Sequence, residues 1–168
     1  MKNKKIKVLI IIFCIIVIID QVTKFLIIKF VKEPIKIIPR ILEFEIVKNT
    51  GIAFGINNGN MKNILLILIF LILIISFIKR QFKLIDIKTM ISLSLMFAGG
   101  VSNLIDRIVI GGVLDFIKIS TFPIFNIADV SIVIGWILLI INIIKFTGIE
   151  DEKEKEIARE NFNTRSKN

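Results

Sequence analysis

The sequence has 168 residues, of which 55% are hydrophobic, and it carries a formal net charge of +9 at pH 7. Soluble domains are usually about 45–50% apolar, and the excess here lies in runs of Ile, Leu and Phe, so the composition favours an α-helical polytopic membrane protein. With no histidine and a single cysteine, the chain excludes Ser-His-Asp and Cys-His catalysis and an internal disulfide, and it argues for a function without a metal or a cofactor.

The first predicted element is a membrane helix over residues 7–30, preceded by a lysine-rich N-terminus. No small-x-small cleavage site follows, so the segment is expected to be an uncleaved anchor whose N-terminal lysines stay in the cytoplasm. Asp20 and Lys24 are four residues apart and can pair on one helix face. Two interpretations stay open: an ordinary ion pair at the interface, or a pair that faces the bundle interior and braces a site.

Residues 32–60 are different in character, because two prolines break any helix there. Residues 42–46 alternate apolar and charged side chains, which is typical of a half-buried strand, and residues 52–56 can return as a second strand. The segment predicts a small antiparallel β-sheet outside the membrane. Asn49 and Gly51 are either plain turn residues or a place where an extended peptide approaches the backbone closely.

Three further membrane helices are predicted over residues 61–78, 89–105 and 124–146, with an outside loop at 108–122. Four spans place both termini on one side, and the lysines that flank the spans indicate the cytoplasm. Because these lysines do not form one stripe, contact with anionic lipid is favoured over nucleic-acid binding. We therefore expect one four-helix membrane domain over residues 1–147 and a charged cytoplasmic tail over residues 148–168.

Three aspartates lie between the third and fourth predicted spans, namely Asp106, Asp115 and Asp129. Ionisable groups at a membrane edge are costly to desolvate and by default mark a working site. Two carboxylates that share a site hold one proton near neutral pH, and an aspartyl peptidase needs such a proton to activate water. We interpret Asp115 and Asp129 as this pair. In the alternative, Asp106 pairs with Arg107 or Lys24, Asp115 lies in water and Asp129 caps a helix.

The chain resembles the bacterial lipoprotein signal peptidases, also called signal peptidase II, over roughly residues 8–146. Five motifs carry the resemblance, in the same order and spacing. They are Asp20-Gln21-x-x-Lys24, Asn49-Thr50-Gly51-Ile52-Ala53-Phe54, Asn103-Leu104-Ile105-Asp106-Arg107, Val113-Leu114-Asp115-Phe116 and Phe122-Pro123-x-Phe125-Asn126-x-Ala128-Asp129. Any one of them is weak, whereas five in order on four spans are highly specific.

The resemblance implies a monomeric four-helix aspartyl endopeptidase of the bacterial cytoplasmic (inner) membrane, with a small extracytoplasmic sheet and its active site near the outer face. Its substrates are prolipoproteins that carry diacylglycerol on a cysteine, and it cuts on the amino side of that cysteine. By position, Asp115 and Asp129 are catalytic, Asp20 and Lys24 are supporting, and the residues that bind substrate or order the site are Asn49, Gly51, Asn103, Asp106, Arg107, Asn126 and Ala128. Two departures are Ser102 in place of a glycine and Ile52 in place of a small residue, and neither touches the pair.

Two other functions compete with this interpretation. A small membrane transporter or scaffold could use the aspartates to bind protons or cations, but a transporter needs its charges near the middle of the bilayer. A prepilin-type peptidase would place its set of catalytic carboxylates in the cytoplasmic loop, and the short basic loop lacks such a set. The placement of Asp115 and Asp129 near one outer edge favours the first interpretation.

Overall fold

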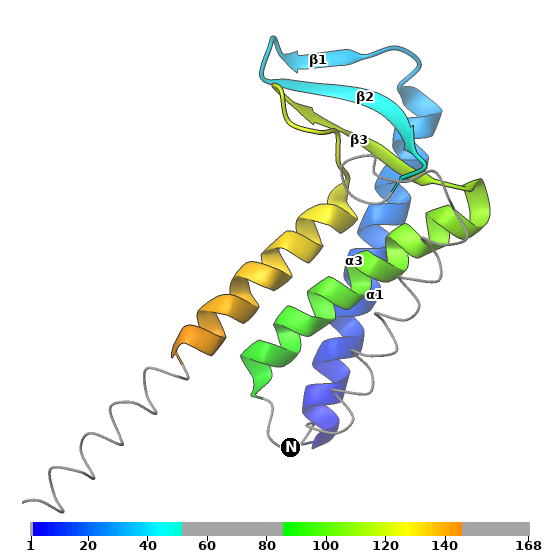
Figure 1. Cartoon of the computed structure of the whole chain (residues 1–168). Coiled ribbons are helices and arrows are strands. Elements are labelled where there is room, and N and C mark those ends of the chain that lie inside the picture. The colour runs from blue at the N-terminus through cyan, green and yellow to red at the C-terminus, as the bar shows by residue number, and fades with distance from the viewer. Residues whose placement is uncertain (1, 52–85, 146–168) are drawn as a thin grey trace, which may run out of the picture.

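The computed structural model describes residues 2–51 and 86–145, which form a set of helices with a small sheet at one end (Figure 1). The helices are α1 (Lys2–Phe30), α3 (Ile87–Ile110) and a helix over Ile127–Lys145, here called the Asp129 helix. The strands are β1 (Ile35–Ile38), β2 (Leu42–Asn49) and β3 (Val113–Ile119). The predicted span at 61–78, the predicted strand at 52–56 and the tail at 148–168 lie outside the described residues.

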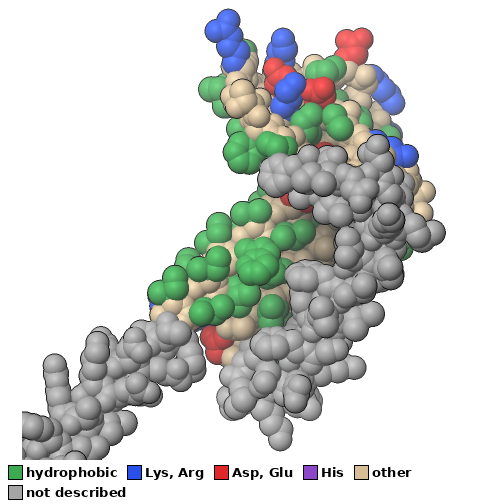
Figure 2. Space-filling view, in the orientation of Figure 1, with side chains coloured by type: hydrophobic (Ala, Val, Ile, Leu, Met, Phe, Trp, Pro, Cys, Tyr) green, Lys and Arg blue, Asp and Glu red, His purple; other side chains and the backbone are tan. Residues whose placement is uncertain are grey.

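Three helices in the described part of the chain are long and apolar enough to cross a membrane: Lys5–Phe30, Ile87–Ile110 and Ile127–Lys145. Large apolar side chains of the first and third of these spans face outward. Figure 2 shows such side chains all over the Asp129 helix, whereas charged side chains gather over the sheet. Exposed apolar surface of this extent needs lipid rather than water around it. The molecule is therefore a membrane protein with a polar end built by the sheet.

The ends of two spans differ from the predicted ones for local reasons. The predicted helix at 89–105 continues to Ile110, because the chain turns only at Gly111, whose φ of 69° suits a residue without a side chain. The last helix begins at Ile127 rather than at residue 124. Phe125 is still extended there, since its backbone exchanges hydrogen bonds with Ile117 of β3.

The sheet is antiparallel, in the order β1-β2-β3. The predicted strand at 42–46 is confirmed within β2, but the predicted loop at 108–122 is wrong over most of its length. Residues 113–119 of that loop form β3, which pairs with β2. The Val, Phe and Ile residues of this segment favour a strand, and this strand brings Asp115 into the sheet.

A β-bulge in β2 decides which side chains face Asp115. Phe44 pairs with Ile117 and Val47 pairs with Asp115, so β2 has one residue more than β3 between these two pairs. The extra residue reverses the alternation of β2. Asn49, which strict alternation would place on the face opposite to Phe44, therefore lies on the same face as Asp115.

Small residues set how closely α3 packs against the Asp129 helix. A Cβ at Gly99 would collide with the Ala128 carbonyl and the Ser131 hydroxyl, and a Cβ at Gly135 would lie 2.6 Å from Met96 Cγ. The Ser131 hydroxyl also donates to the Leu95 carbonyl at 3.2 Å. In lipid, such close backbone contact is a main source of helix association. This packing fixes the height of Asp129 relative to α3.

Replacing Gly99 by valine should therefore separate α3 from the Asp129 helix. We expect Gly99→Val to lower stability by about 1–3 kcal/mol, the usual cost of overpacking, as measured by thermal unfolding in detergent micelles. Ile140→Val, on the exposed face of the Asp129 helix, is the control and should leave the unfolding temperature nearly unchanged. Equal unfolding temperatures for Gly99→Val and wild type would contradict the packing.

Candidate active site

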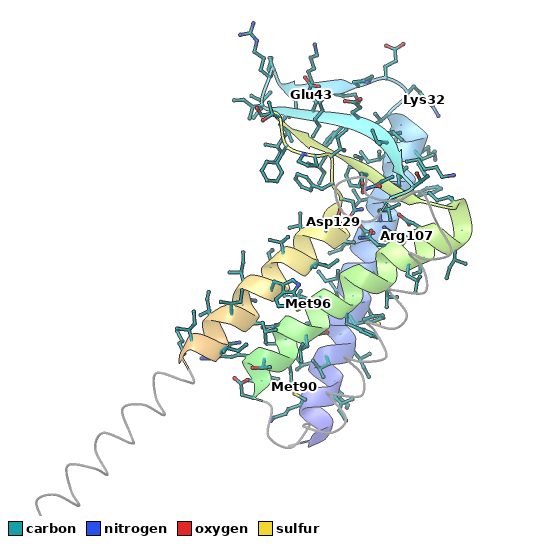
Figure 3. The ribbon with its side chains drawn as sticks, in the orientation of Figure 1. Lys32, Glu43, Met90, Met96, Arg107 and Asp129 are labelled. Atoms are coloured by element: carbon teal, nitrogen blue, oxygen red, sulfur yellow. The ribbon has the colours of Figure 1, made fainter. Side chains whose placement is uncertain are left out.

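Asp115 and Asp129 meet at the junction between the sheet and the helices, where Figure 3 shows Asp129 beside Arg107. Asp115 lies in β3 and Asp129 is the third residue of its helix. One asparagine contacts both: Asn126 Nδ2 donates to Asp115 Oδ1 at 2.7 Å, and Asn126 N donates to Asp129 Oδ2 at 3.2 Å. Two carboxyl groups from different elements are thus held on the two sides of a single residue.

Asn126 and Asp129 form a reciprocal cap at the start of the Asp129 helix. The Asp129 N–H donates to Asn126 Oδ1 at 2.9 Å, while the Asp129 carboxylate accepts from the Asn126 N–H. This is the capping-box arrangement, and the helix N-terminus favours negative charge there. Asp129 does cap its helix, as the alternative interpretation held. Its carboxylate nevertheless lies at the site, because it also accepts a hydrogen bond from Asn103.

Asn103 of α3 is oriented by its three partners. Its Oδ1 accepts from Lys24 Nζ at 3.3 Å and from Asn126 Nδ2 at 3.1 Å, and its Nδ2 donates to Asp129 Oδ1 at 2.8 Å. Because its oxygen faces two donors, its nitrogen must face the carboxylate. Asn103 therefore places an N–H donor on Asp129 in a fixed orientation.

Asp115 is 3% exposed, so the alternative in which it sits in water is wrong. Burial raises the pKa of its carboxyl group to about 6, and the hydrogen bond from Asn49 and the charge of Asp129 have smaller, opposing effects. Desolvation disfavours the charged form, and a neighbouring carboxylate does the same. A carboxyl group with this pKa can hold a proton near neutral pH.

Hydrogen bonds also hold the end of β2, at Asn49, and the following Gly51 next to Asp115. Asn49 Nδ2 donates to Asp115 Oδ2 at 3.0 Å, and Asn49 Oδ1 accepts from the Gly51 N–H at 3.0 Å. The buried Arg107 guanidinium donates to the Gly51 carbonyl at 3.1 Å and to the Asn103 carbonyl at 3.3 Å. These bonds hold the backbone at Asn49 and Gly51 against the aspartate pair.

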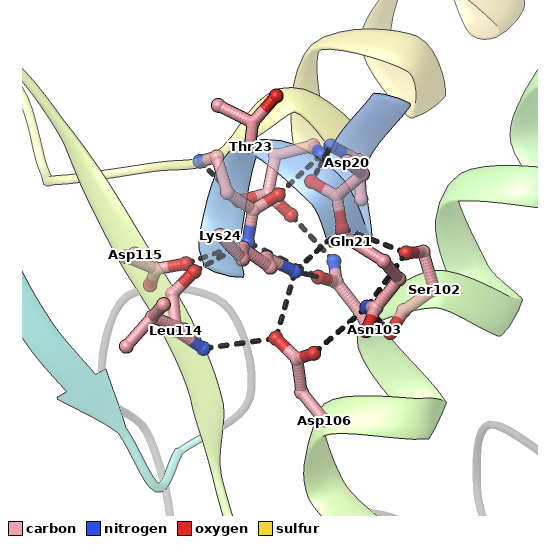
Figure 4. A network of polar contacts seen from close by, with 12 residues as sticks. Asp20, Gln21, Thr23, Lys24, Ser102, Asn103, Asp106, Leu114 and Asp115 are labelled. Carbon is pink, nitrogen blue, oxygen red and sulfur yellow. Dashed lines mark hydrogen bonds and ion pairs between the residues drawn. The ribbon is translucent and has the colours of Figure 1, made fainter. Parts of the chain in front are cut away.

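Lys24 is the centre of a second, fully buried layer of contacts (Figure 4). Its Nζ lies 2.7 Å from Asp20 Oδ2 and 2.7 Å from Asp106 Oδ2. Asp20 Oδ1 accepts from the Ala128 N–H at 2.9 Å, and Asp106 Oδ2 accepts from the Leu114 N–H at 3.0 Å. Each of these N–H groups belongs to the residue just before one member of the aspartate pair. We call this arrangement the Lys24 clamp.

The Lys24 clamp settles the orientation of the Asp20–Lys24 pair, which faces the interior and not the interface. It also confirms the pairing of Asp106 with Lys24 that the alternative interpretation allowed. The eleven residues singled out from the sequence are joined in one network: Asp20, Lys24, Asn49, Gly51, Asn103, Asp106, Arg107, Asp115, Asn126, Ala128 and Asp129.

Two members of the network were missed by the sequence analysis as site residues. The Gln21 amide donates to Asp106 Oδ1 at 2.9 Å and to Ser102 Oγ at 3.0 Å, and Ser102 Oγ donates to Asp20 Oδ2 at 2.7 Å. A signal was present, because Gln21 is a polar residue of an apolar segment and belongs to the first motif. Ser102 was noted only as a departure from glycine.

Comparison with known proteins shows what the chain is similar to. The model of the family described as signal peptidase (SPase) II matches residues 12–145. Proteins named lipoprotein signal peptidase from Staphylococcus aureus strains JH9 and Newman are 43% identical over 148 residues, covering 83% of this chain and 89% of each relative.

Two solved structures described as a bacterial membrane enzyme superpose on the fold. The first, at 2.3 Å resolution, has a TM-score of 0.75 and 40% identity, and covers 84% of this chain and 90% of its own. The second, at 1.9 Å resolution, has a TM-score of 0.73 and 39% identity, and the match covers 83% of this chain and 94% of the solved one. The three described spans and the three-stranded sheet are thus an architecture that is also found in solved membrane enzymes.

The contact between Asn49 and Asp115 predicts a shift in pH dependence. The N–H of Asn49 stabilises the ionised form of Asp115 and lowers its pKa, so Asn49→Leu should raise that pKa above about 6. The pH profile of kcat should then move to higher pH. Glu33→Gln, an exposed change next to β1, should leave the profile in place. An unshifted profile in an active Asn49→Leu variant would show that Asn49 does not act on Asp115.

Removing the lysine of the clamp should destabilise the fold. In Lys24→Met the carboxylates of Asp20 and Asp106 stay buried without their cation, and breaking a buried pair in this way costs about 3–5 kcal/mol. Lys29→Met is the matched control, because Lys29 lies on the same helix and is exposed. We expect thermal unfolding in detergent to show a large loss for Lys24→Met and little for Lys29→Met. Equal losses would argue against the clamp.

Proposed function

We propose that this chain, which belongs to the signal peptidase II family, removes signal peptides from prolipoproteins by using Asp115 and Asp129 to activate a water molecule. Family membership makes the chain an aspartic-type peptidase of the membrane. The competing interpretation as a transporter or scaffold is therefore dropped.

One observation carries the proposal, namely that Asn126 contacts both carboxyl groups at the polar end of three apolar helices. In the described part of the chain, the hydrogen-bond donors of both aspartates are N–H groups of asparagines and not lysine or arginine side chains. Amide donors orient a carboxylate without neutralising it, so one proton can be shared across the pair.

The reaction begins with one proton on the pair. The ionised carboxylate takes a proton from water while the water oxygen bonds to the scissile carbonyl carbon, and the protonated carboxyl group donates its proton to the carbonyl oxygen. The resulting gem-diol then collapses. One of its hydroxyl groups gives its proton to the ionised carboxylate as the C–N bond breaks. The leaving nitrogen takes the proton that the other carboxyl group had received from water. The pair ends with one proton, as it started.

Asn49, Gly51 and Arg107 are proposed to contact the substrate. They adjoin Asp115, and a glycine allows a peptide backbone to approach closely. Among the described residues, none accepts a hydrogen bond from the buried Nε–H of Arg107. An unpaired buried donor is costly, and a carbonyl oxygen of the bound peptide would satisfy it.

The place of the pair suits a lipid-modified substrate that is cut on the amino side of its diacylglyceryl cysteine. Val130, the residue after Asp129, is 38% exposed, and Val133 one turn further is 56% exposed. The carboxyl group of Asp129 therefore borders an apolar surface of a membrane span. An acyl chain that stays in the bilayer can lie along this surface while the peptide lies over the pair.

The proposed topology follows from the two ends of α1. Its lysine-rich start lies at the end of the molecule opposite the sheet (Figure 1), and such a start stays in the cytoplasm. The sheet and the aspartate pair are then at the extracytoplasmic face of the bacterial inner membrane. With the predicted span at 61–78 the chain has four spans, both termini are cytoplasmic, and the enzyme acts as a monomer.

The test is cleavage of a diacylglyceryl-modified preprolipoprotein by the purified protein in lipid vesicles. Asp115→Asn and Asp129→Asn should each lower kcat/KM by at least about a thousandfold while the variants keep the wild-type unfolding temperature within a few degrees. Glu33→Gln is the control and should cleave normally. The same preprolipoprotein without its lipid should not be cleaved. Full cleavage by either asparagine variant would overturn the assignment of the pair.

A further inference from the structure

Gln21 and Ser102 have no role in the proposed mechanism, yet both lie inside the Lys24 clamp. We propose that they are positioning residues for the peptidase reaction. They donate hydrogen bonds to Asp20 and Asp106 and so stabilise the one negative charge of the clamp that Lys24 does not neutralise. This keeps the two carboxylates in contact with the backbone N–H groups of Leu114 and Ala128. This inference rests on the proposed function, because the positions in question are those of Asp115 and Asp129.

The charges of the clamp do not balance. Asp20 and Asp106 are two acids, and Lys24 is the only cation that lies within ion-pair distance of them in the described part of the chain. Both acids are buried, Asp20 completely, so water does not solvate the excess negative charge. A buried charge needs hydrogen-bond donors if it is not neutralised. Neutral hydrogen-bond donors must therefore stabilise the negative charge that a second cation would otherwise neutralise.

The donors divide evenly between the two acids. Asp20 accepts from Ser102 Oγ at 2.7 Å and from the Ala128 N–H at 2.9 Å, in addition to Lys24. Asp106 accepts from Gln21 Nε2 at 2.9 Å and from the Leu114 N–H at 3.0 Å, in addition to Lys24. Each acid thus has the shared lysine, one side-chain donor and one backbone donor.

Gln21 and Ser102 also fix each other. Ser102 Oγ accepts from Gln21 Nε2 at 3.0 Å, so its single hydrogen is directed to Asp20. The Ser102 side chain is completely buried, so water does not compete for its hydroxyl group. Gln21 Nε2 additionally reaches the Ser102 carbonyl at 3.2 Å, which ties α1 to α3 at this level. The two side chains act as one unit between the two acids.

The backbone contacts give this unit its effect on the reaction. If Ser102 no longer holds one oxygen of Asp20, the carboxylate can rotate toward Lys24 and release the Ala128 N–H, which precedes Asp129. If Gln21 no longer holds Asp106 Oδ1, the carboxylate is fixed only through Oδ2, which contacts both Lys24 and the N–H of Leu114, the residue before Asp115; the carboxylate can then turn about that oxygen and shift this N–H. Small changes in the placement of a reacting group lower kcat strongly. Substrate binding, which uses other residues, should be little affected.

The charged groups around the unit come from four elements. They are Asp20 and Lys24 of α1, Asp106 and Arg107 of α3, Asp115 of β3, and Asp129 of the Asp129 helix. Acids outnumber bases in this set. A carboxylate introduced at Gln21 would therefore be repelled by its surroundings, whereas a protonated carboxyl group there would again donate a hydrogen bond.

The first experiment separates kcat from KM for Ser102→Ala and Gln21→Met in lipid vesicles. A lost hydrogen bond to a buried charge corresponds to about a tenfold effect, so each variant should lower kcat roughly tenfold at unchanged KM. Ser102→Thr keeps a hydroxyl group and should recover most of the activity. The double variant should lose less than the product of the two single losses, because the residues form one unit. Unchanged kcat in both single variants would overturn the proposal.

The second experiment uses Gln21→Glu, which has almost the same size. At neutral pH its carboxylate repels Asp106, and at acid pH its protonated form restores the donor. We expect the activity of this variant, relative to wild type, to rise as the pH is lowered from 8 to about 5. The activity is normalised to the amount of folded protein at each pH, because the repulsion also makes folding stability depend on pH. A normalised ratio that stays constant from pH 8 to about 5 would overturn the proposal.

Two controls distinguish this inference from the proposed function. Asp115→Asn and Asp129→Asn must be inactive for either to hold. If they are inactive while Ser102→Ala and Gln21→Met keep wild-type kcat, the positioning role fails and the mechanism stands. If the asparagine variants remain active, the mechanism itself fails. Thr23 is a half-exposed neighbour whose hydroxyl donates to the Ile19 carbonyl within α1, and Thr23→Ala should behave as wild type.

Discussion

The structure depends on one ammonium group that is shared by two buried carboxylates. Lys24 lies 2.7 Å from both Asp20 and Asp106, and neither acid can leave it without exposing a charge to an apolar interior. Since each acid also holds a backbone N–H next to a member of the aspartate pair, the lysine fixes two distant parts of the chain at once. A charge cluster at the end of a helix bundle thus serves as a structural reference point for the chemistry.

The remaining elements bring the two carboxyl groups to this reference point from opposite sides. The bulge in β2 and the pairing with β3 present Asp115 and Asn49 on one face of the sheet. The reciprocal cap with Asn126 and the close packing at Gly99 present Asp129 at the start of its helix. Asparagines complete the site because their amides orient carboxylates without neutralising them. The two acids are thus held next to one another at the polar end of the apolar helices, as the proposed mechanism requires.

The sequence predicts the described spans better than it predicts the sheet. Long apolar runs with flanking lysines are strong signals, so the helices at 7–30 and 89–105 were found with errors only at their ends. The sequence predicts a loop at 113–119 instead of a strand. The segment is short, and its partner β2 is more than sixty residues away, so no local pattern indicates the pairing. The clamp could not be predicted either. Helix spacing pairs Asp20 with Lys24, but only the tertiary fold brings Asp106, Ser102 and two backbone N–H groups to them.

The central claim is that Asp20 and Asp106 act as one unit through Lys24 on the positions of the aspartate pair. A double-mutant cycle of kcat/KM with Asp20→Asn, Asp106→Asn and the double variant measures this directly. Coupling through the shared lysine predicts an interaction energy well above about 0.5 kcal/mol, the usual limit of additivity for independent sites. If the two effects add within that limit, each acid acts alone, and the clamp does not set the geometry of the reaction.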